Sequence, residues 1–244
     1  MVLNNYRERA DVILVPIAGR LTRISPNTIT YISLLFAAVC GISFYLSDQS
    51  DDYLILAFTM MFLSALFDAL DGKVARITNT VSIKGDLLDH VIDRYSDILI
   101  LGGIAFSPYC SLEIGFIAII TVLMLSYMGT QAQAVGGKRH YGGWLGRADR
   151  LMLLLGGTML QYIMITMFDT REIFEFYLLS WLLLLFIFVG NIDAIRRFQD
   201  TWRDLDETES ADSEDALPER STAPVRPRII ESSEDSDDIE WSGK

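Results

Sequence analysis

Long apolar stretches, separated by short polar connectors, dominate the first 195 residues of the chain. Six of them are long enough to cross a bilayer as helices, because about 20 apolar residues span its hydrocarbon core. They occupy residues 27–47, 53–75, 82–107, 112–135, 149–168 and 173–195. We therefore predict an all-α integral membrane protein with six transmembrane helices.

An amphipathic pattern precedes the first of these stretches. Apolar residues recur there every three or four positions, while charged residues at positions 7, 8, 9 and 11 lie on the opposite side. The apolar positions are Leu3, Tyr6, Ala10, Ile13, Ile17 and Leu21. The pattern predicts an N-terminal helix in the cytoplasmic membrane interface, bent at Pro16. A plain polar leader is the alternative. The sequence Ser25-Pro26-Asn27 then predicts the start of the first spanning helix, with Ser25 as its cap.

Composition agrees with a membrane protein, and charge divides the chain. Hydrophobic residues make up 51% of the 244 residues, which is high for a soluble domain. The net charge is −12, but residues 200–244 alone carry 15 acids and 5 bases, so the first 199 residues carry only −2. We predict a juxtamembrane segment (1–24), a six-helix transmembrane catalytic domain (25–199) and an acidic disordered tail (200–244). The tail either solvates the protein or docks a partner.

The distribution of bases among the connectors predicts the orientation in the membrane. One set of connectors and adjoining span ends holds 13 of the 15 bases of the first 199 residues, Lys84 among them, whereas the opposite set holds only Arg171. Basic residues favour the cytoplasmic side. Both termini are therefore expected in the cytoplasm, and the protein in the cytoplasmic membrane.

Four aspartates flank the connector between the second and third stretches. Asp68 and Asp71 are three residues apart, and Asp89 and Asp93 are four apart, so each pair shares one helical face. Carboxylates that converge from two neighbouring helices repel one another unless cations hold them. Hard divalent cations, Mg²⁺ first among them, prefer such oxygen ligands. The sequence therefore predicts a metal site at the membrane surface.

The third stretch is longer than the membrane requires. A helix over residues 82–107 extends about 39 Å, compared with a hydrocarbon core of about 30 Å. The surplus can carry the acids out to the interface. Asp86 and Asp97 continue the same helical face, and we predict structural roles for both. Asp97 lies a turn deeper and needs a partner, such as an arginine from another helix.

The acids belong to a longer pattern, D-x-x-D-G-x-x-A-R, eight residues, then G-x-x-x-D-x-x-x-D. The matching residues are Asp68, Asp71, Gly72, Ala75, Arg76, Gly85, Asp89 and Asp93. This pattern resembles the signature of the CDP-alcohol phosphatidyltransferases, and the similarity in layout extends over roughly residues 3–198. The resemblance implies an enzyme that transfers the phosphate of a CDP-activated lipid to an alcohol and releases CMP.

The resemblance, together with the chemistry of the side chains, suggests a role for each signature residue. Asp68, Asp71 and Asp89 are the predicted ligands of two Mg²⁺ ions, with Mn²⁺ as a substitute. Asp93 is the predicted general base and a further candidate ligand. The predicted nucleotide or diphosphate contacts are Gly72, Ala75, Arg76, Gly85 and Asn27. Helix packing for the glycines, a cytoplasmic anchor for Arg76 and plain capping geometry around Asn27 remain alternatives.

The connector between the fourth and fifth stretches is rich in glycine and bases. Lys138, Arg139, Arg147 and Arg150 are candidates for binding the phosphate of an acceptor such as glycerol phosphate or inositol phosphate. Topology alone explains these bases equally well. Relatives that use inositol phosphate tend to place a basic cluster at the end of the fourth span. Residues 127–134 are neutral here, which weighs against inositol phosphate.

A cation transporter is the alternative function, because transporters also place acids within membrane spans. Against it, the acids cluster at one interface, and a transporter leaves the glycine and arginine spacing unexplained. Cys40 and Cys110 are expected to be apolar fillers. The resembled family implies a homodimer and no nucleic acid partner.

Overall fold

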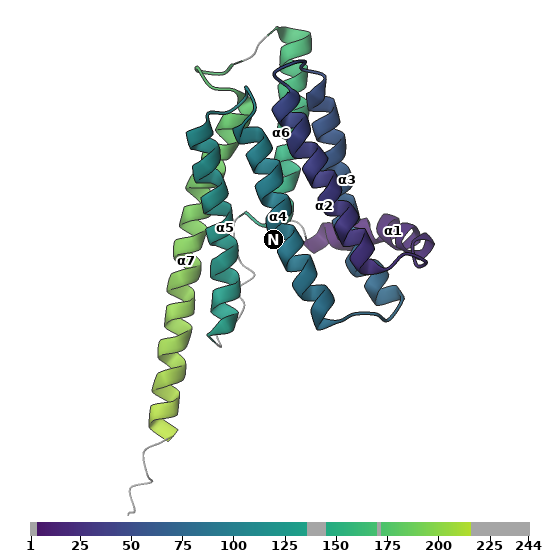
Figure 1. The fold of residues 1–244 in the computed structure, drawn as a ribbon. Helices are drawn as coiled ribbons and strands as arrows, with labels where there is room; N and C mark the ends of the chain where they lie inside the picture. Colours follow the sequence, from purple (N-terminus) through teal and green to yellow (C-terminus); the bar gives the residue numbers. More distant parts are fainter. Residues whose placement is uncertain (1–3, 136–144, 170–171, 216–244) are drawn as a thin grey trace, which may run out of the picture. The chain divides into compact units, whose positions relative to one another are not determined.

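The computed structural model describes residues 4–135, 145–169 and 172–215. Seven helices and no β-strand make up this part of the chain (Figure 1). They are α1 (Asn4–Arg20), α2 (Pro26–Leu46), α3 (Tyr53–Ile77), α4 (Ile83–Ala105), α5 (Leu112–Ala134), α6 (Arg147–Phe168) and α7 (Leu178–Asp215). The all-helical class predicted from the sequence is confirmed.

Serine side chains fix where three of the helices begin. The Oγ atoms of Ser25, Ser82 and Ser111 accept hydrogen bonds from backbone N–H groups in the first turns of α2, α4 and α5, at 3.2, 3.1 and 3.4 Å. Each bond satisfies an N–H group that has no partner within the helix. The cap predicted at Ser25, with Pro26 in the first turn, is confirmed.

The last helix differs from its prediction at both ends. It begins at Leu178 rather than at 173, because Phe174 and Glu175 have φ values of 50° and 66° and form a tight turn. It also continues to Asp215, so the disordered tail predicted from residue 200 cannot begin there. Residues 200–215 contain neither glycine nor proline, and nothing in them interrupts the helix. Residues 216–244 of the predicted tail lie outside the described residues.

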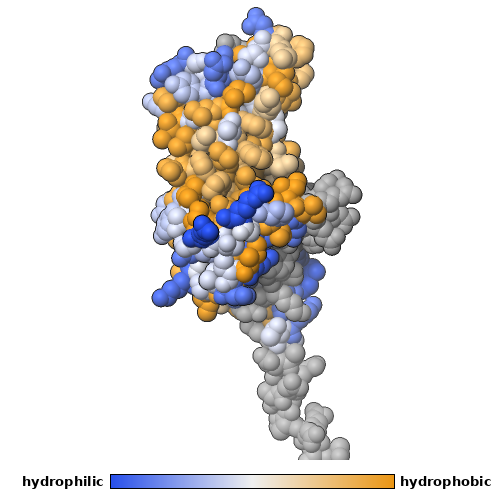
Figure 2. Space-filling view, turned by 90° about the vertical axis from the view of Figure 1, so that its right-hand side faces the viewer, coloured by the Kyte–Doolittle hydropathy of each residue, from blue (hydrophilic) through white to orange (hydrophobic). Residues whose placement is uncertain are grey.

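Five helices, namely α2, α3, α5, α6 and α7, are long and apolar enough to cross a membrane. The 23-residue α4, predicted as the third span, is not among these five because its first four turns carry six charged residues. Figure 2 shows a face on which hydrophobic residues form a broad band between hydrophilic residues at both ends.

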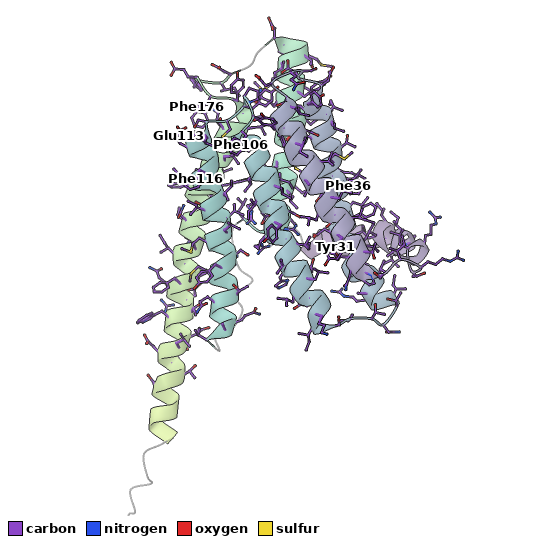
Figure 3. The ribbon with its side chains drawn as sticks, in the orientation of Figure 1. Tyr31, Phe36, Phe106, Glu113, Phe116 and Phe176 are labelled. Carbon is purple, nitrogen blue, oxygen red and sulfur yellow. The ribbon has the colours of Figure 1, made fainter. Side chains whose placement is uncertain are left out.

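Helix α2 packs against both α3 and α4. Against α3, the ring of Phe36 (labelled in Figure 3) makes an edge-to-face contact with Phe67, with centroids 5.2 Å apart. Against α4, glycines allow the two backbones to touch. A Cβ atom on Gly41 would collide with the backbone of Leu99, and one on Gly103 would collide with the backbone of Gly41. Small residues permit this close approach of helices within membranes.

Helix α1 packs against α3 through a small apolar cluster that includes the buried residues Ala18, Leu70 and Val74. An ion pair between Lys73 and Asp11 joins the same two helices. Two apolar residues of α1 are nevertheless exposed, Val12 at 75% and Ile13 at 65%. Pro16 lies inside the helix, where the sequence analysis expected a bend.

The close contact between α2 and α4 leads to the first prediction. Replacing Gly103 by alanine should separate the helices and lower the stability by about 1–3 kcal/mol, the usual cost of overpacking. Thermal unfolding in detergent measures the loss. Gly102→Ala is the matched control, because a Cβ atom at Gly102 meets nothing within 4 Å. Equal melting temperatures for the two variants would contradict the predicted contact.

Candidate active site

Three of the four signature aspartates converge between α3 and α4. Asp68 projects from α3, and Asp89 and Asp93 project from α4 one turn apart. One carboxylate oxygen from each lies within 4.8 Å of the other two. We call these three residues the carboxylate group. The Oδ1 atom of Asp68 is buried and accepts no hydrogen bond in the described part of the chain. Three converging carboxylates with an unsatisfied oxygen fit the ligand preference of Mg²⁺ or Mn²⁺.

The fourth aspartate, Asp71, lies beside the carboxylate group and is already held by hydrogen bonds. Thr30 of α2 donates its hydroxyl proton to Asp71 Oδ2 over 2.6 Å, and the N–H of Gly72 donates to Oδ1 over 2.5 Å. Both Thr30 and Asp71 are buried. Each carboxylate oxygen keeps a second lone pair. The hydrogen bonds therefore orient Asp71 and leave it able to bind a cation.

A pocket of about 210 Å³ adjoins these acids. Its wall comes from the start of α2, the end of α3, the start of α4 and the connector between α3 and α4. The lining residues include all five that the sequence analysis assigned to the nucleotide, together with Asp71, Asp86 and Asp89. Those five are Asn27, Gly72, Ala75, Arg76 and Gly85.

The two signature glycines differ in what surrounds them. A Cβ atom on Gly72 would meet nothing within 4 Å, so this glycine is not required by helix packing. Because Gly72 lines the pocket, its missing side chain leaves room there. A Cβ atom on Gly85 would lie 3.2 Å from the Oγ atom of Ser82, which caps α4. Packing thus contributes at Gly85 but not at Gly72.

Arg147, the first residue of α6, reaches into the carboxylate group. Its Nη1 atom lies 2.6 Å from Asp68 Oδ2 and 2.6 Å from Asp93 Oδ1. The sequence analysis assigned Arg147 to the acceptor phosphate, together with Arg150, Lys138 and Arg139. Of these, Lys138 and Arg139 lie outside the described residues.

Asp97 is surrounded by three arginines. Its carboxylate oxygens lie 3.8 Å from Arg94 Nε, 3.7 Å from Arg147 Nε and 3.7 Å from Arg150 Nη2. Two of these arginines come from α6, so the prediction that another helix supplies a partner is confirmed. Asp97 is only 7% exposed, and such a buried acid needs compensating positive charge.

One hydrogen bond to α7 and two local ones hold the start of α6. The backbone N–H of Leu145 donates to Asp193 Oδ2 over 3.5 Å, and the carbonyl of Leu145 accepts from Arg150 Nη1 over 3.3 Å. The N–H of Gly146 donates to Asp149 Oδ2 over 3.0 Å. These bonds hold the two residues that precede α6 and so help to position its first residue, Arg147, beside the acids.

Two residues of the site escaped the sequence analysis. Thr30 lies three residues after Asn27, so helical spacing places both on one face of α2, where they line the same pocket. Arg94 follows Asp93 directly and lies three residues before Asp97 on α4, and it contacts Asp93 at 3.2 Å and Asp97 at 3.8 Å.

Residues 23–189 of the chain match the family model of the CDP-alcohol phosphatidyltransferases. The chain belongs to this family. It is therefore a CDP-alcohol phosphatidyltransferase, an enzyme of phospholipid synthesis with transmembrane helices. The transferase hypothesis from the sequence is confirmed over the transporter alternative.

Comparison with individual proteins agrees with the family. The archaetidylinositol phosphate synthase of Pyrococcus horikoshii is 32% identical over 159 residues, which cover 65% of this chain and 79% of the relative. A phosphatidylinositol phosphate synthase of Mycobacterium tuberculosis shares the fold. Its structure with bound CDP-DAG has a TM-score of 0.63 at 24% identity, covering 78% of this chain and 94% of the other. Its complex with manganese and citrate has a TM-score of 0.64 at 23% identity, covering 78% and 88%.

The hydrogen bond between Thr30 and Asp71 leads to the second prediction. Thr30→Val keeps the shape of the side chain but removes the donor to a buried carboxylate. We expect the transferase rate to fall about tenfold, since a hydrogen bond to a charged group contributes about 1.5–3 kcal/mol. Release of CMP from a CDP-lipid measures the rate. In the control Thr158→Val, the lost hydroxyl bonds only the carbonyl of Leu154 within α6. A similar decrease in both variants would contradict an orienting role for Thr30.

Proposed function

We propose that this transferase moves a phosphatidyl-type phosphate from a CDP-activated lipid to a phosphorylated polyol and releases CMP. The lipid is a diacylglycerol or an archaeol. The observation that carries the proposal is the position of Asp89, which belongs both to the carboxylate group and to the wall of the pocket. A nucleotide in this pocket would have its diphosphate next to the acids.

Asp68, Asp71, Asp89 and Asp93 are the proposed ligands of two Mg²⁺ ions, for which Mn²⁺ can substitute. Divalent ions bound there would neutralise and align the diphosphate, which is the main requirement of phosphoryl transfer. The manganese complex of the M. tuberculosis enzyme supports a divalent cation in this fold. Within this chain, the support is the geometry of the carboxylate group.

The donor is assigned to the pocket. Its wall combines the uncharged Asn27, Gly72, Ala75 and Gly85 with Arg76, whose planar guanidinium can bond two phosphate oxygens at once. The open space beside Gly72 allows close approach of a ligand to the backbone of α3. The CDP-DAG complex of the M. tuberculosis enzyme supports a CDP-lipid as the donor.

Asp93 is the proposed general base. Its carboxylate takes the proton of the acceptor hydroxyl while the hydroxyl oxygen forms a bond to the lipid phosphorus. The bond from this phosphorus to the bridging oxygen breaks, and CMP leaves with that oxygen. Asp93 suits this role because it belongs to the carboxylate group, one turn beyond Asp89, but does not line the donor pocket as Asp89 does.

For the acceptor we propose inositol phosphate ahead of glycerol phosphate. The similarity to an archaetidylinositol phosphate synthase supports this choice. The neutral end of α5 had weighed against it. However, α6 and α7 supply bases next to the acids: Arg147 and Arg150 lie beside Asp97, and Arg197 lies close enough to Arg150 to interact electrostatically. These arginines offer a phosphate the positive charge that α5 lacks.

We propose that six helices span the membrane, namely α4 and the five helices that are apolar enough to cross it. We also propose that α1 lies in the cytoplasmic interface. A helix of 23 residues extends about 35 Å, which is enough to cross. The apolar and exposed side chains of Val12 and Ile13 on α1 suit an interfacial helix. Both termini and the active site would then face the cytoplasm. The homodimer expected from the sequence stays a prediction.

The third prediction tests the reaction directly. Purified protein is incubated with radiolabelled CDP-diacylglycerol or CDP-archaeol and with inositol phosphate, glycerol phosphate, inositol, serine, glycerol or ethanolamine. We expect CMP release that depends on inositol phosphate, stops with EDTA and resumes with excess Mg²⁺ or Mn²⁺. Release with glycerol phosphate instead would reassign the acceptor. Release that is independent of metal would contradict the proposed site.

The fourth prediction concerns Asp93. Asp93→Asn keeps the size of the side chain but removes its capacity to accept a proton, so the turnover rate should fall by about 10²–10⁴. Steady-state CMP release measures the rate, and binding of the CDP-lipid should persist because Asp93 does not line the pocket. Asp48→Asn, an identical change at an exposed position in the α2–α3 connector, is the control. A near-normal rate for Asp93→Asn would remove Asp93 from the base role.

A further inference from the structure

A single nitrogen atom of Arg147 bridges two aspartates from different helices. Nη1 lies at the same 2.6 Å from an oxygen of Asp68 on α3 and from an oxygen of Asp93 on α4. Both aspartates belong to the carboxylate group, whose oxygens converge within 4.8 Å. The guanidinium therefore contacts two of the three groups that a metal ion would need.

The surroundings strengthen these contacts. The side chain of Arg147 is 21% exposed, and those of Asp68 and Asp93 are 19% and 14% exposed. Water screens ion pairs poorly at such burial, so each pair is stronger than one on an open surface. Arg147 thus neutralises part of the negative charge that the acids would otherwise place next to one another.

We propose that Arg147 is a built-in cation that competes with divalent ions for Asp68 and Asp93 and leaves them when these ions bind. The inference rests on the metal site proposed above and adds that Arg147 lowers the affinity of this site for divalent ions. A guanidinium at these oxygens and a divalent ion bound to the same carboxylates repel each other, so each weakens the binding of the other.

Asp97 gives Arg147 a second anchor. The Nε atom of Arg147 lies 3.7 Å from Oδ1 of Asp97, which is not a member of the carboxylate group. When Nη1 leaves Asp68 and Asp93, this contact can keep the side chain beside the site. Asp97 also pairs with Arg94 and Arg150, which do not contact Asp68. The negative charge of Asp97 therefore stays compensated by Arg94 and Arg150 when Arg147 leaves Asp68 and Asp93.

The fifth prediction is that removing Arg147 tightens metal binding. Mn²⁺ titration of the substrate-free protein in detergent, followed by the electron paramagnetic resonance of free Mn²⁺, measures affinity without reference to turnover. We expect Arg147→Met to bind Mn²⁺ about tenfold more tightly than the unaltered protein. The matched control is Arg150→Met, one turn further along α6. Among the described residues, Arg150 pairs with Asp97 and with no member of the carboxylate group, so the Mn²⁺ affinity of Arg150→Met should change less than about threefold.

Thermal unfolding supplies a second readout. Without metal, Arg147→Met should melt at a lower temperature than the unaltered protein, because the acids lose their internal counter-charge. Saturating Mn²⁺ should raise its melting temperature more than that of the unaltered protein. A merely structural arginine would lower both temperatures equally. Arg147→Lys retains one positive charge and should fall between the two proteins in affinity.

The outcomes separate this inference from the proposed function. Mn²⁺ binding by the unaltered protein with equal or weaker binding by both Arg147 variants would overturn the inference and leave the metal site standing. Binding by none of the proteins would overturn both. Should Arg147→Met fail to fold, the lysine variant decides alone, because affinity no higher than that of the unaltered protein overturns the competition.

Discussion

The need to compensate several carboxylates at the edge of a membrane-spanning bundle shapes this protein. Isolated, such acids would repel one another and resist transfer out of water. Helix α6 supplies the compensating positive charge. Arg147 contacts the carboxylate group, and both Arg147 and Arg150 contact Asp97. Helix α6 therefore cannot be displaced without exposing buried acids. A bond to α7 from Leu145, two residues before α6, helps to hold this helix in place.

Backbone packing sets the distance at which these charges meet. Helix α2 contacts both α3 and α4, and Gly41 and Gly103 bring α2 and α4 together without intervening side chains. From this position α2 also supplies Thr30 to Asp71 and Asn27 to the pocket. Helix α2, which carries no signature aspartate, therefore helps to position α3 and α4, which carry all four.

Features of the site that depend on helical periodicity could be predicted from the sequence. Spacings of three and four placed Asp68, Asp89 and Asp93 on facing sides of two helices, and the structure brings them together. The sequence also predicted an arginine partner for Asp97 from the cost of burying a charge. The contact of Arg147 with Asp68 joins residues 79 positions apart, and no local pattern encodes such a contact. The end of α7 was missed for another reason, since acidic composition was read as disorder where no residue breaks the helix.

The bases near α6 have two possible explanations, orientation of the protein in the membrane and binding of a phosphate. These explanations do not exclude each other. Basic residues on the cytoplasmic side of a span favour its orientation during insertion, where only their number and location matter. Once the bundle has formed, the same guanidinium groups lie among acids and beside the site that we propose for a phosphate, where their geometry matters. Arg147 illustrates both, because it begins a spanning helix and touches Asp68 and Asp93. In a protein this small, a charge that fixes orientation is also available to the site, so neither role argues against the other.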